Sequence, residues 1–351
     1  MDSSVEQSGG SDTLNTQVPA EAAANAVVFE APGRLALHKV SLTTPANDDV
    51  LIDVHATGIS TGTERLLWEG EMPDFPGMGY PLIPGYETVG RIAVAGVDSN
   101  AEVGRWVFVG GAQCFPAYRN LFGGAASRLV VPEAKVQPIE SHLGNDGLLL
   151  ALAATAYHAL HTQPDQQTVP DLIIGHGVLG RLLVRICIAL GFPPPTVWEI
   201  NPARRDGATT AESGGGDSYQ VIDPAQDTSR GYRCVIDVSG DSTVLDRCLP
   251  SLAPRMANQP SSQVVLAGFY KKPVAFEFAQ AFMRELRIQV AAEWQPGDLK
   301  AVNDLVSSGD LSLSGLITHT MPVTQAAQAY EIAFRDEKCL KMVLDWGNNN
   351  A

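Results

Sequence analysis

A glycine-rich string near the middle of the chain has the spacing of a phosphate-binding loop. Residues 175–180 read G-H-G-V-L-G, which matches the pattern G-x-G-x-x-G. Apolar residues 172–174 predict a buried strand before it, and residues 181–190 predict a helix after it. In that context Gly175 permits a tight turn, Gly177 lets the backbone approach a pyrophosphate, and Gly180 lets helix and strand pack closely. Because the free N–H groups at a helix start attract anions, the string predicts a dinucleotide site.

An acid follows this string at the distance where dinucleotide-binding proteins place a ribose-binding group. Glu199 ends the next predicted strand, about 20 residues beyond the glycines, where a carboxylate accepts hydrogen bonds from the ribose hydroxyls. It would also repel a 2′-phosphate, so it favours NAD over NADP. Two alternatives stay open: Glu199 as an ordinary strand-end carboxylate, and Arg204 as the acceptor of a 2′-phosphate. His176, between the first two glycines, is interpreted as a permissive variable position. The expected cofactor contacts here are Gly175, Gly177, Val178, Leu179, Gly180, Glu199, Asn201 and Arg204.

The pattern of the remaining chain divides it into four parts. Residues 1–25 contain almost no large apolar side chain and predict a disordered tail. Short β-branched runs between glycines and prolines, up to about residue 138, predict an all-β region that begins at Ala26. From about residue 148, six strand-like runs alternate with helical runs and predict a doubly wound parallel sheet. The last stretch predicts helices over 299–307 and 323–334, a short strand near 316–318 and a final strand at 342–346.

Composition excludes several classes of protein. Apolar residues make up 45% of the chain, which is typical of a globular protein. The net charge of −15 argues against nucleic acid as a partner, because binding a phosphate backbone requires basic side chains. Five scattered cysteines without a C-x-x-C pair predict free thiols in a reducing compartment. With no secretory signal and no apolar run of membrane-spanning length, we expect a cytoplasmic protein without an integral membrane segment.

Three short motifs in the β-rich region carry a resemblance to a known superfamily. Residues 58–64 read G-I-S-T-G-T-E, residues 84–90 read P-G-Y-E-T-V-G, and residues 103–107 read V-G-R-W-V. They resemble the G-I-C-G-T-D, P-G-H-E-x-x-G and V-G-D-x-V motifs of the medium-chain dehydrogenase/reductase superfamily. The resemblance covers residues 26–346 and implies an α/β fold: a GroES-like catalytic domain over 26–145, a Rossmann domain over 146–293 and a segment over 294–351 that returns to the catalytic domain. It places Ser239, Gly268 and Phe269 at strand ends that contact the cofactor.

The same motifs lack the metal ligands of the zinc-containing members. Ser60 and Tyr86 stand where those members have a cysteine and a histidine, so only Glu87 remains of that ligand set. A hydroxyl and a phenol are poor substitutes for thiolate and imidazole at Zn²⁺. Cys114 is alone in its region, so a four-cysteine structural site is missing as well. The sequence therefore predicts no metal, either catalytic or structural.

Longer strings resemble one branch of the superfamily, whose members oxidise a hydroxyethyl group on a tetrapyrrole. These strings are residues 58–70, 75–81, 198–205, 292–296 and 339–346. The resemblance implies an NAD-dependent alcohol dehydrogenase that forms an acetyl group on a small-molecule tetrapyrrole. It also carries the expectation of a homodimer formed through the outer edge of the sheet.

A planar tetrapyrrole requires a wide apolar slot. The apolar residues of the loop over 66–80, together with an aromatic residue after the last strand of the parallel sheet, are the candidates for its wall: Trp68, Met78, Tyr80 and Trp294. The alternative for that loop is a surface segment that covers a small core of its own.

Oxidation of an alcohol also requires a path for the hydroxyl proton. By the resemblance, Thr63 takes the position of a hydroxyl relay and Glu64 the adjacent acid position, so we expect Glu64 to act as a base through Thr63. Tyr86 and Glu87, in the altered ligand motif, are the further catalytic candidates. Glu64 as a supporting carboxylate and Tyr86 as a packing residue are the alternatives. Two rival functions remain: a zinc-independent NADPH quinone or enoyl reductase, and a nucleotide-binding protein without catalysis.

Overall fold

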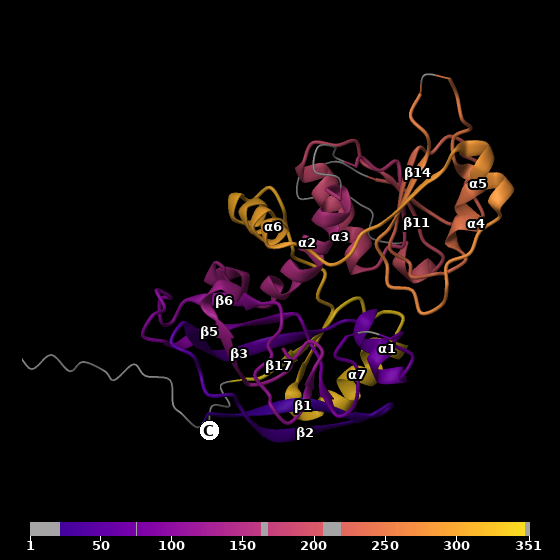
Figure 1. The fold of residues 1–351 in the computed structure, drawn as a ribbon. Helices are drawn as coiled ribbons and strands as arrows, with labels where there is room; N and C mark the ends of the chain where they lie inside the picture. Colours follow the sequence, from indigo (N-terminus) through magenta and orange to yellow (C-terminus); the bar gives the residue numbers. More distant parts are fainter. Residues whose placement is uncertain (1–21, 75, 163–167, 206–218, 258, 348–351) are drawn as a thin grey trace, which may run out of the picture.

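The computed structural model describes residues 22–74, 76–162, 168–205, 219–257 and 259–347, which form two parts (Figure 1). Residues of both parts line one cleft. Residues 1–21 of the predicted tail lie outside the described residues. The predicted boundary at residue 25 is corrected, because strand β1 (Ala23–Ala31) begins at Ala23. Ala24 is buried and the Asn25 N–H donates to Ser127 Oγ at 2.9 Å. Partners distant in the sequence therefore order these small residues.

The β-rich part contains two sheets that enclose one apolar core. One sheet has the strand order β2-β1-β4-β7, and the other has the order β16-β17-β3-β5-β6-β9 with β8 paired to β3. Phe29 of β1, Ile52 of β3 and Leu129 of β8 are fully buried in this core. Besides β1, the strands of these two sheets are β2 (Arg34–Ser41), β3 (Asp49–Ile59), β4 (Leu82–Ile83), β5 (Thr88–Ala95), β6 (Trp106–Val109), β7 (Arg119–Asn120), β8 (Arg128–Pro132), β9 (Val136–Pro138), β16 (His319–Pro322) and β17 (Met342–Asp345).

The second part is a six-stranded parallel sheet with helices on both faces, which confirms the predicted α/β fold class. Its order is β12 (Val221–Ile222), β11 (Thr196–Trp198), β10 (Leu172–Ile174), β13 (Cys234–Asp237), β14 (Gln263–Leu266) and β15 (Arg287–Val290). Helices α2 (Leu150–Leu160), α3 (Val178–Ala189) and α6 (Pro296–Ser308) share one apolar core, and α4 (Val244–Cys248) and α5 (Phe278–Arg284) share another (Figure 1). The order reverses between β10 and β13, and such a switch point is where open α/β sheets bind ligands.

The helix after the glycine string begins earlier than predicted. Gly177 is the N-cap of α3, so Gly180 lies in its first turn and not before it. A Cβ on Gly180 would stand 1.9 Å from the carbonyl oxygen of Gly175, and Gly175 has a φ of +107°. Only glycine fits at these two positions, which is the close packing that the spacing predicts.

The C-terminal segment crosses back to the β-rich part. Strand β17 (Met342–Asp345) pairs antiparallel with β3 and parallel with β16 (His319–Pro322), and α7 (Ala326–Arg335) packs against β2 and β17 (Figure 1). The crossing begins later than residue 294, because α6 packs on α2. The short strand predicted near 316–318 is found instead at β16, since Leu316 is buried in the core of the parallel-sheet part.

Two further expectations concern the whole chain. The five cysteines are all free thiols, as predicted. Within the described ranges, no helix combines the length and apolarity that crossing a bilayer demands.

Candidate functional site

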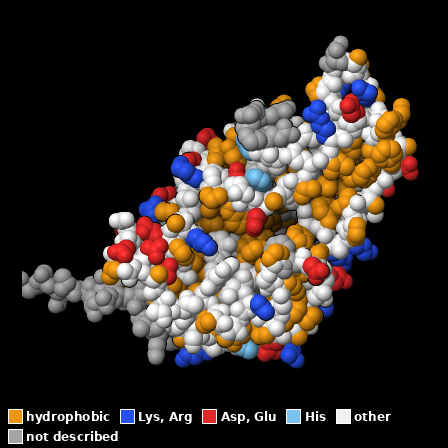
Figure 2. Space-filling model, viewed as in Figure 1, with side chains coloured by type: hydrophobic (Ala, Val, Ile, Leu, Met, Phe, Trp, Pro, Cys, Tyr) orange, Lys and Arg blue, Asp and Glu red, His pale blue; other side chains and the backbone are white. Residues whose placement is uncertain are grey.

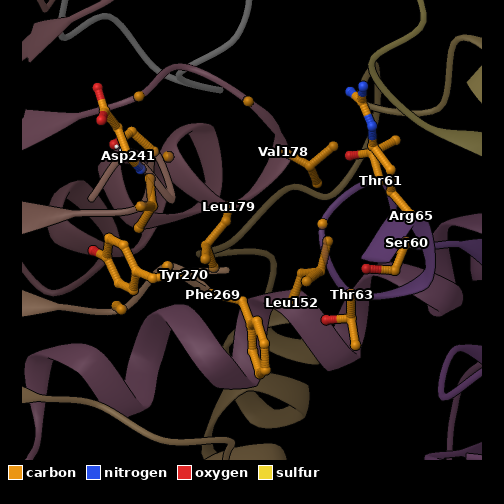
Figure 3. A pocket seen from close by; sticks show the side chains of 18 of the residues that line it. Ser60, Thr61, Thr63, Arg65, Leu152, Val178, Leu179, Asp241, Phe269 and Tyr270 are labelled. Carbon is orange, nitrogen blue, oxygen red and sulfur yellow. Dashed lines mark hydrogen bonds between the residues drawn. The ribbon is translucent and has the colours of Figure 1, made fainter. Parts of the chain in front are cut away.

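A cleft of about 1010 Å³ lies between the two parts. Its walls come from α1 (Thr63–Glu69), the loop before it and Tyr86 on one side, and from the glycine string and the ends of the parallel strands on the other. Figure 3 shows Ser60, Thr63 and Arg65 facing Val178, Leu179 and Phe269 across this space. Figure 2 shows the hollow with apolar side chains around it. The volume is in the range of cavities that bury a drug-sized ligand.

One wall of the cleft brings together nearly all the residues expected to contact a cofactor. Those that line it are Gly175, Gly177, Val178, Leu179, Gly180, Glu199, Arg204, Ser239, Gly268 and Phe269. Asn201 does not line it. The Asn201 Oδ1 accepts a hydrogen bond from the Ala203 N–H at 3.0 Å, so this side chain caps the turn that leads to Arg204.

Glu199 is held in place by the backbone on both sides of the wall. Its Oε2 accepts from the His176 N–H at 2.9 Å, and its Oε1 accepts from the Asn201 N–H at 2.7 Å. The carboxylate is nearly buried but still borders the cleft. Each carboxylate oxygen can accept more than one hydrogen bond, so lone pairs remain for ribose hydroxyls.

The facing wall presents a group of hydroxyls. Ser60 Oγ and Tyr86 Oη lie 2.7 Å apart, and the hydroxyl of Thr63 also interacts with the Tyr86 phenol. Ser60, Thr63 and Tyr86 all line the cleft. Burial raises the pKa of Tyr86, and the hydrogen bonds from Ser60 and Thr63 oppose that rise. The phenol is therefore protonated at neutral pH and can donate a hydrogen bond.

Glu64 points away from the cleft. It is fully buried, its Oε2 accepts from Tyr330 Oη at 2.7 Å, and its Oε1 accepts from the Ser60 N–H at 3.2 Å. Helix α1 causes this orientation, because Thr63 and Glu64 lie on different sides of its first turn. Burial raises the pKa of Glu64 to about 7. The expected route from substrate through Thr63 to Glu64 is corrected: Glu64 supports the Ser60 backbone from behind the wall.

Glu87 is also buried behind the wall, and its partner comes from the far end of the chain. The Nζ of Lys341 forms an ion pair with Glu87 Oε2 and donates to the carbonyl oxygen of Ile59 at 3.2 Å. Burial raises the pKa of Glu87, and the ammonium of Lys341 opposes that rise. Because Ile59 precedes Ser60 and Glu87 follows Tyr86, this one side chain connects both halves of the hydroxyl wall.

Sequence reasoning missed Lys341 as a site residue. The side chain is 2% exposed, and the residue borders the cleft. The signal was present as a single lysine between apolar neighbours directly before a strand, inside a string that matched the superfamily branch. Its partner could not be read from the sequence, because the pairing of β17 with β3 decides it.

The expected substrate contacts divide in two. Trp294 lines the cleft and lies near Tyr86, with ring centroids 6.1 Å apart. Trp68, Met78 and Tyr80 are not among the lining residues: Trp68 packs on Phe29 and Tyr330, Met78 packs on the core of the β-rich part, and Tyr80 donates to the carbonyl oxygen of Leu67. These three side chains cover a core of their own, as in the alternative interpretation, while Met72 of the same loop lines the cleft. Apolar side chains that do line the cleft include Met72, Phe122, Leu152, Phe269, Phe334 and Leu340.

The raised pKa of Glu64 predicts a specific dependence of stability on pH. Because the pKa in the fold, about 7, exceeds the ordinary 4.5, the fold favours the protonated acid. That stabilisation is complete below pH about 4.5 and is lost as the pH rises through about 7. The side chain of Glu64→Gln cannot ionise. Between pH about 4.5 and about 7, the free energy of unfolding of this variant should therefore rise by about 3 kcal/mol relative to that of wild type.

Thermal or denaturant unfolding at a series of pH values measures this difference. Glu69→Gln, on the exposed side of the same helix, is the matched control and should run parallel to wild type. Parallel curves for Glu64→Gln and wild type would contradict the assignment.

Comparisons with known proteins show the family of this chain. The model of the alcohol dehydrogenase GroES-like domain matches residues 46–141. Two 2-desacetyl-2-hydroxyethyl bacteriochlorophyllide A dehydrogenases are similar over nearly the whole chain. The protein of Rhodobacter capsulatus is 47% identical over 91% of this chain and 97% of its own. That of Cereibacter sphaeroides is 48% identical over 92% of this chain and 98% of its own.

Among solved structures, an alcohol dehydrogenase of Escherichia coli CFT073, complexed with NADH, superposes with a TM-score of 0.76. It shares 22% identity over 92% of this chain and 99% of its own, which supports the fold. Within the described residues, no three His, Cys, Asp or Glu side chains converge on a point that could hold a metal ion. The chain belongs to the family of 2-desacetyl-2-hydroxyethyl bacteriochlorophyllide A dehydrogenases, within the medium-chain dehydrogenase/reductase superfamily.

Proposed function

We propose that this chain oxidises the 3-(1-hydroxyethyl) group of a bacteriochlorophyllide to a 3-acetyl group, with NAD as cofactor and without zinc. The observation that carries the proposal is the cleft, which has a nucleotide-type glycine wall on one side and a wall of hydroxyls on the other. The names of the two relatives that are 47% and 48% identical supply the substrate class.

The glycine wall fits a nicotinamide dinucleotide. Bound there, the dinucleotide supplies the hydride acceptor that oxidation of an alcohol needs. An added Cβ at Gly177 would meet nothing within 4 Å, so the backbone is open to a pyrophosphate at the start of α3. Glu199, at the end of β11, is positioned to accept from ribose hydroxyls and to repel a 2′-phosphate, which favours NAD. Arg204 also borders this region and favours the rival NADPH-dependent reductase.

The facing wall does not fit zinc. Ser60 offers a neutral hydroxyl, Tyr86 offers a phenol whose pKa burial raises, and Glu87 is paired with Lys341. Zinc sites in proteins use thiolates, imidazoles and free carboxylates. A cation at this position would also stand close to the ammonium of Lys341. We therefore derive no step through a metal.

The hydroxyl wall suits the proton chemistry of an alcohol. Ser60, Thr63 and Tyr86 offer donors and acceptors that can orient a carbinol oxygen. As the hydride leaves, their hydrogen-bonded chain relays the hydroxyl proton to solvent water in the cleft, which accepts it. The substrate assists, because a conjugated macrocycle delocalises the positive charge that develops as the hydride leaves the carbinol carbon. Glu64 and Glu87 act from behind the wall as positioning residues.

A turnover assay tests this proposal. We expect the purified protein to convert a 3-hydroxyethyl bacteriochlorophyllide and NAD⁺ to the 3-acetyl product and NADH, at the same rate with and without a strong zinc chelator. NADP⁺ in place of NAD⁺ is the matched control for the cofactor and should be the poorer acceptor. Loss of turnover on chelation, with recovery on addition of zinc, would overturn the metal-free assignment, and absence of turnover would overturn the substrate.

We also propose that two copies associate through the outer edge of the parallel sheet. Strand β15 is the edge strand of the sheet, and natural proteins normally cover such an edge. Beside it, α5 exposes Phe278, Phe282 and Met283, and Figure 2 shows this apolar area on the α5 side. A patch that contains both a strand edge and large apolar side chains suits an isologous contact with a second copy.

Sedimentation velocity tests the dimer. We expect a dimer for wild type and a monomer for Phe282→Asp, because a charge would be buried in the contact. Val97→Asp is the matched control, since Val97 is 66% exposed and Phe282 is 68% exposed, but Val97 lies in the β-rich part. A monomeric wild type, or dissociation by Val97→Asp as well, would rule out this contact.

A further inference from the structure

His176 lies inside the glycine string, and its side chain is fully buried. Its Nδ1 lies 2.6 Å from the carbonyl oxygen of Arg204, and its Nε2 lies 2.8 Å from Tyr219 Oη. The interpretation of this position as permissive is therefore wrong. The residue reaches behind the glycine wall to two segments that follow β11 in the chain.

These two contacts define the state of the imidazole. A carbonyl oxygen can only accept, so Nδ1 carries the proton and donates to Arg204. The unprotonated Nε2 then accepts from the hydroxyl of Tyr219. Burial, followed by the charge of Arg181, lowers the pKa of His176 to about 4, which agrees with a neutral ring. The side chain is thus held by two hydrogen bonds and takes no part in proton transfer at neutral pH.

The same residue also contacts the acid of the nucleotide wall. The backbone N–H of His176 donates to Glu199 Oε2 at 2.9 Å, while its side chain holds the backbone of Arg204. Arg181 reinforces this arrangement, because its Nη2 donates to the Arg204 carbonyl oxygen at 3.3 Å. One residue therefore fixes the relative positions of Glu199 and Arg204, the acid that favours NAD and the cation that favours a 2′-phosphate.

We propose that His176 is a positioning residue that sets the choice between NAD and NADP. The imidazole holds the backbone of the turn that ends at Arg204 and so keeps the guanidinium from moving toward a phosphate on the ribose. The carboxylate of Glu199 is then the charged group that meets the ribose. Without the imidazole, the turn gains freedom and Arg204 can approach a 2′-phosphate. This inference rests on the proposed function, since it requires a nicotinamide nucleotide in the cleft.

Equilibrium binding of nucleotide fragments to the full-length protein tests this role without turnover. Calorimetry with ADP-ribose and with its 2′-phosphate measures the preference for the unphosphorylated ribose. We expect His176→Ala to reduce that preference about three- to tenfold, the change that loss of one buried hydrogen bond produces. In turnover, the KM for NAD⁺ should rise and kcat should stay unchanged, because the chemistry occurs at the other end of the cofactor.

Two conservative variants make the test specific. The Nδ2–H of Asn in His176→Asn can take the place of Nδ1–H and donate to Arg204, so this variant should keep most of the preference. In His176→Gln the amide reaches toward Tyr219 and leaves the Arg204 carbonyl without this donor, so the preference should fall as in His176→Ala. If His176→Ala does not fold, the difference in ribose preference between His176→Asn and His176→Gln tests the role of the imidazole.

Several results would overturn the inference. Equal preference in wild type and His176→Ala, or equal loss in the Asn and Gln variants, would show that the imidazole does not set the choice. A wild-type protein that binds neither fragment nor NAD⁺ would overturn the proposed function and this inference together. A wild type that binds NAD⁺ with a preference that the variants leave unchanged would overturn this inference alone.

Discussion

Two carboxylates buried behind one wall of the cleft constrain the rest of the site. A buried acid must find hydrogen bonds or a cation, or it gives up its charge. Glu64 accepts hydrogen bonds from Tyr330 and the Ser60 backbone, and Glu87 forms an ion pair with Lys341 through one of its two oxygens. Both Tyr330 and Lys341 belong to the C-terminal segment, so the hydroxyl wall is complete only when β17 has paired with β3 and α7 has docked. Removal of one partner from such a pair typically costs about 3–5 kcal/mol, which links the stability of the fold to the geometry of the site.

The opposite wall follows the same principle with different chemistry. There a neutral imidazole and a buried carboxylate connect the glycine string to the turn after β11. In each wall, a buried side chain contacts the backbone of another segment: Lys341 donates to the carbonyl oxygen of Ile59, and His176 donates to that of Arg204. Between the two walls, the cleft of about 1010 Å³ is lined in part by apolar side chains.

Local patterns in the sequence predicted the strands of the parallel sheet, its order of alternation with helices and the glycine wall, because spacing within a few residues decides those features. The orientation of Glu64 was not predictable in this way, since it depends on whether residues 63–69 form a helix or a loop. Lys341 and its partner Glu87 stand far apart in the sequence and meet only through strand pairing. Trp68 and Tyr80 are large aromatic residues of the kind that line a substrate slot, but in the fold they pack against the core beneath their own loop. His176 illustrates the same limit, because its partners follow the next strand.

We propose that hydroxyls supported by a buried charge network perform the work that zinc performs in other members of the superfamily. Single-turnover hydride transfer in metal-free protein, with Thr63→Val compared with wild type at saturating NAD⁺ and substrate, tests it most directly. We expect loss of the Thr63 hydroxyl to slow hydride transfer about a hundredfold or more and to leave the affinity for NAD⁺ unchanged. Transfer at the wild-type rate in Thr63→Val, and again when Ser60→Ala is added, would contradict it.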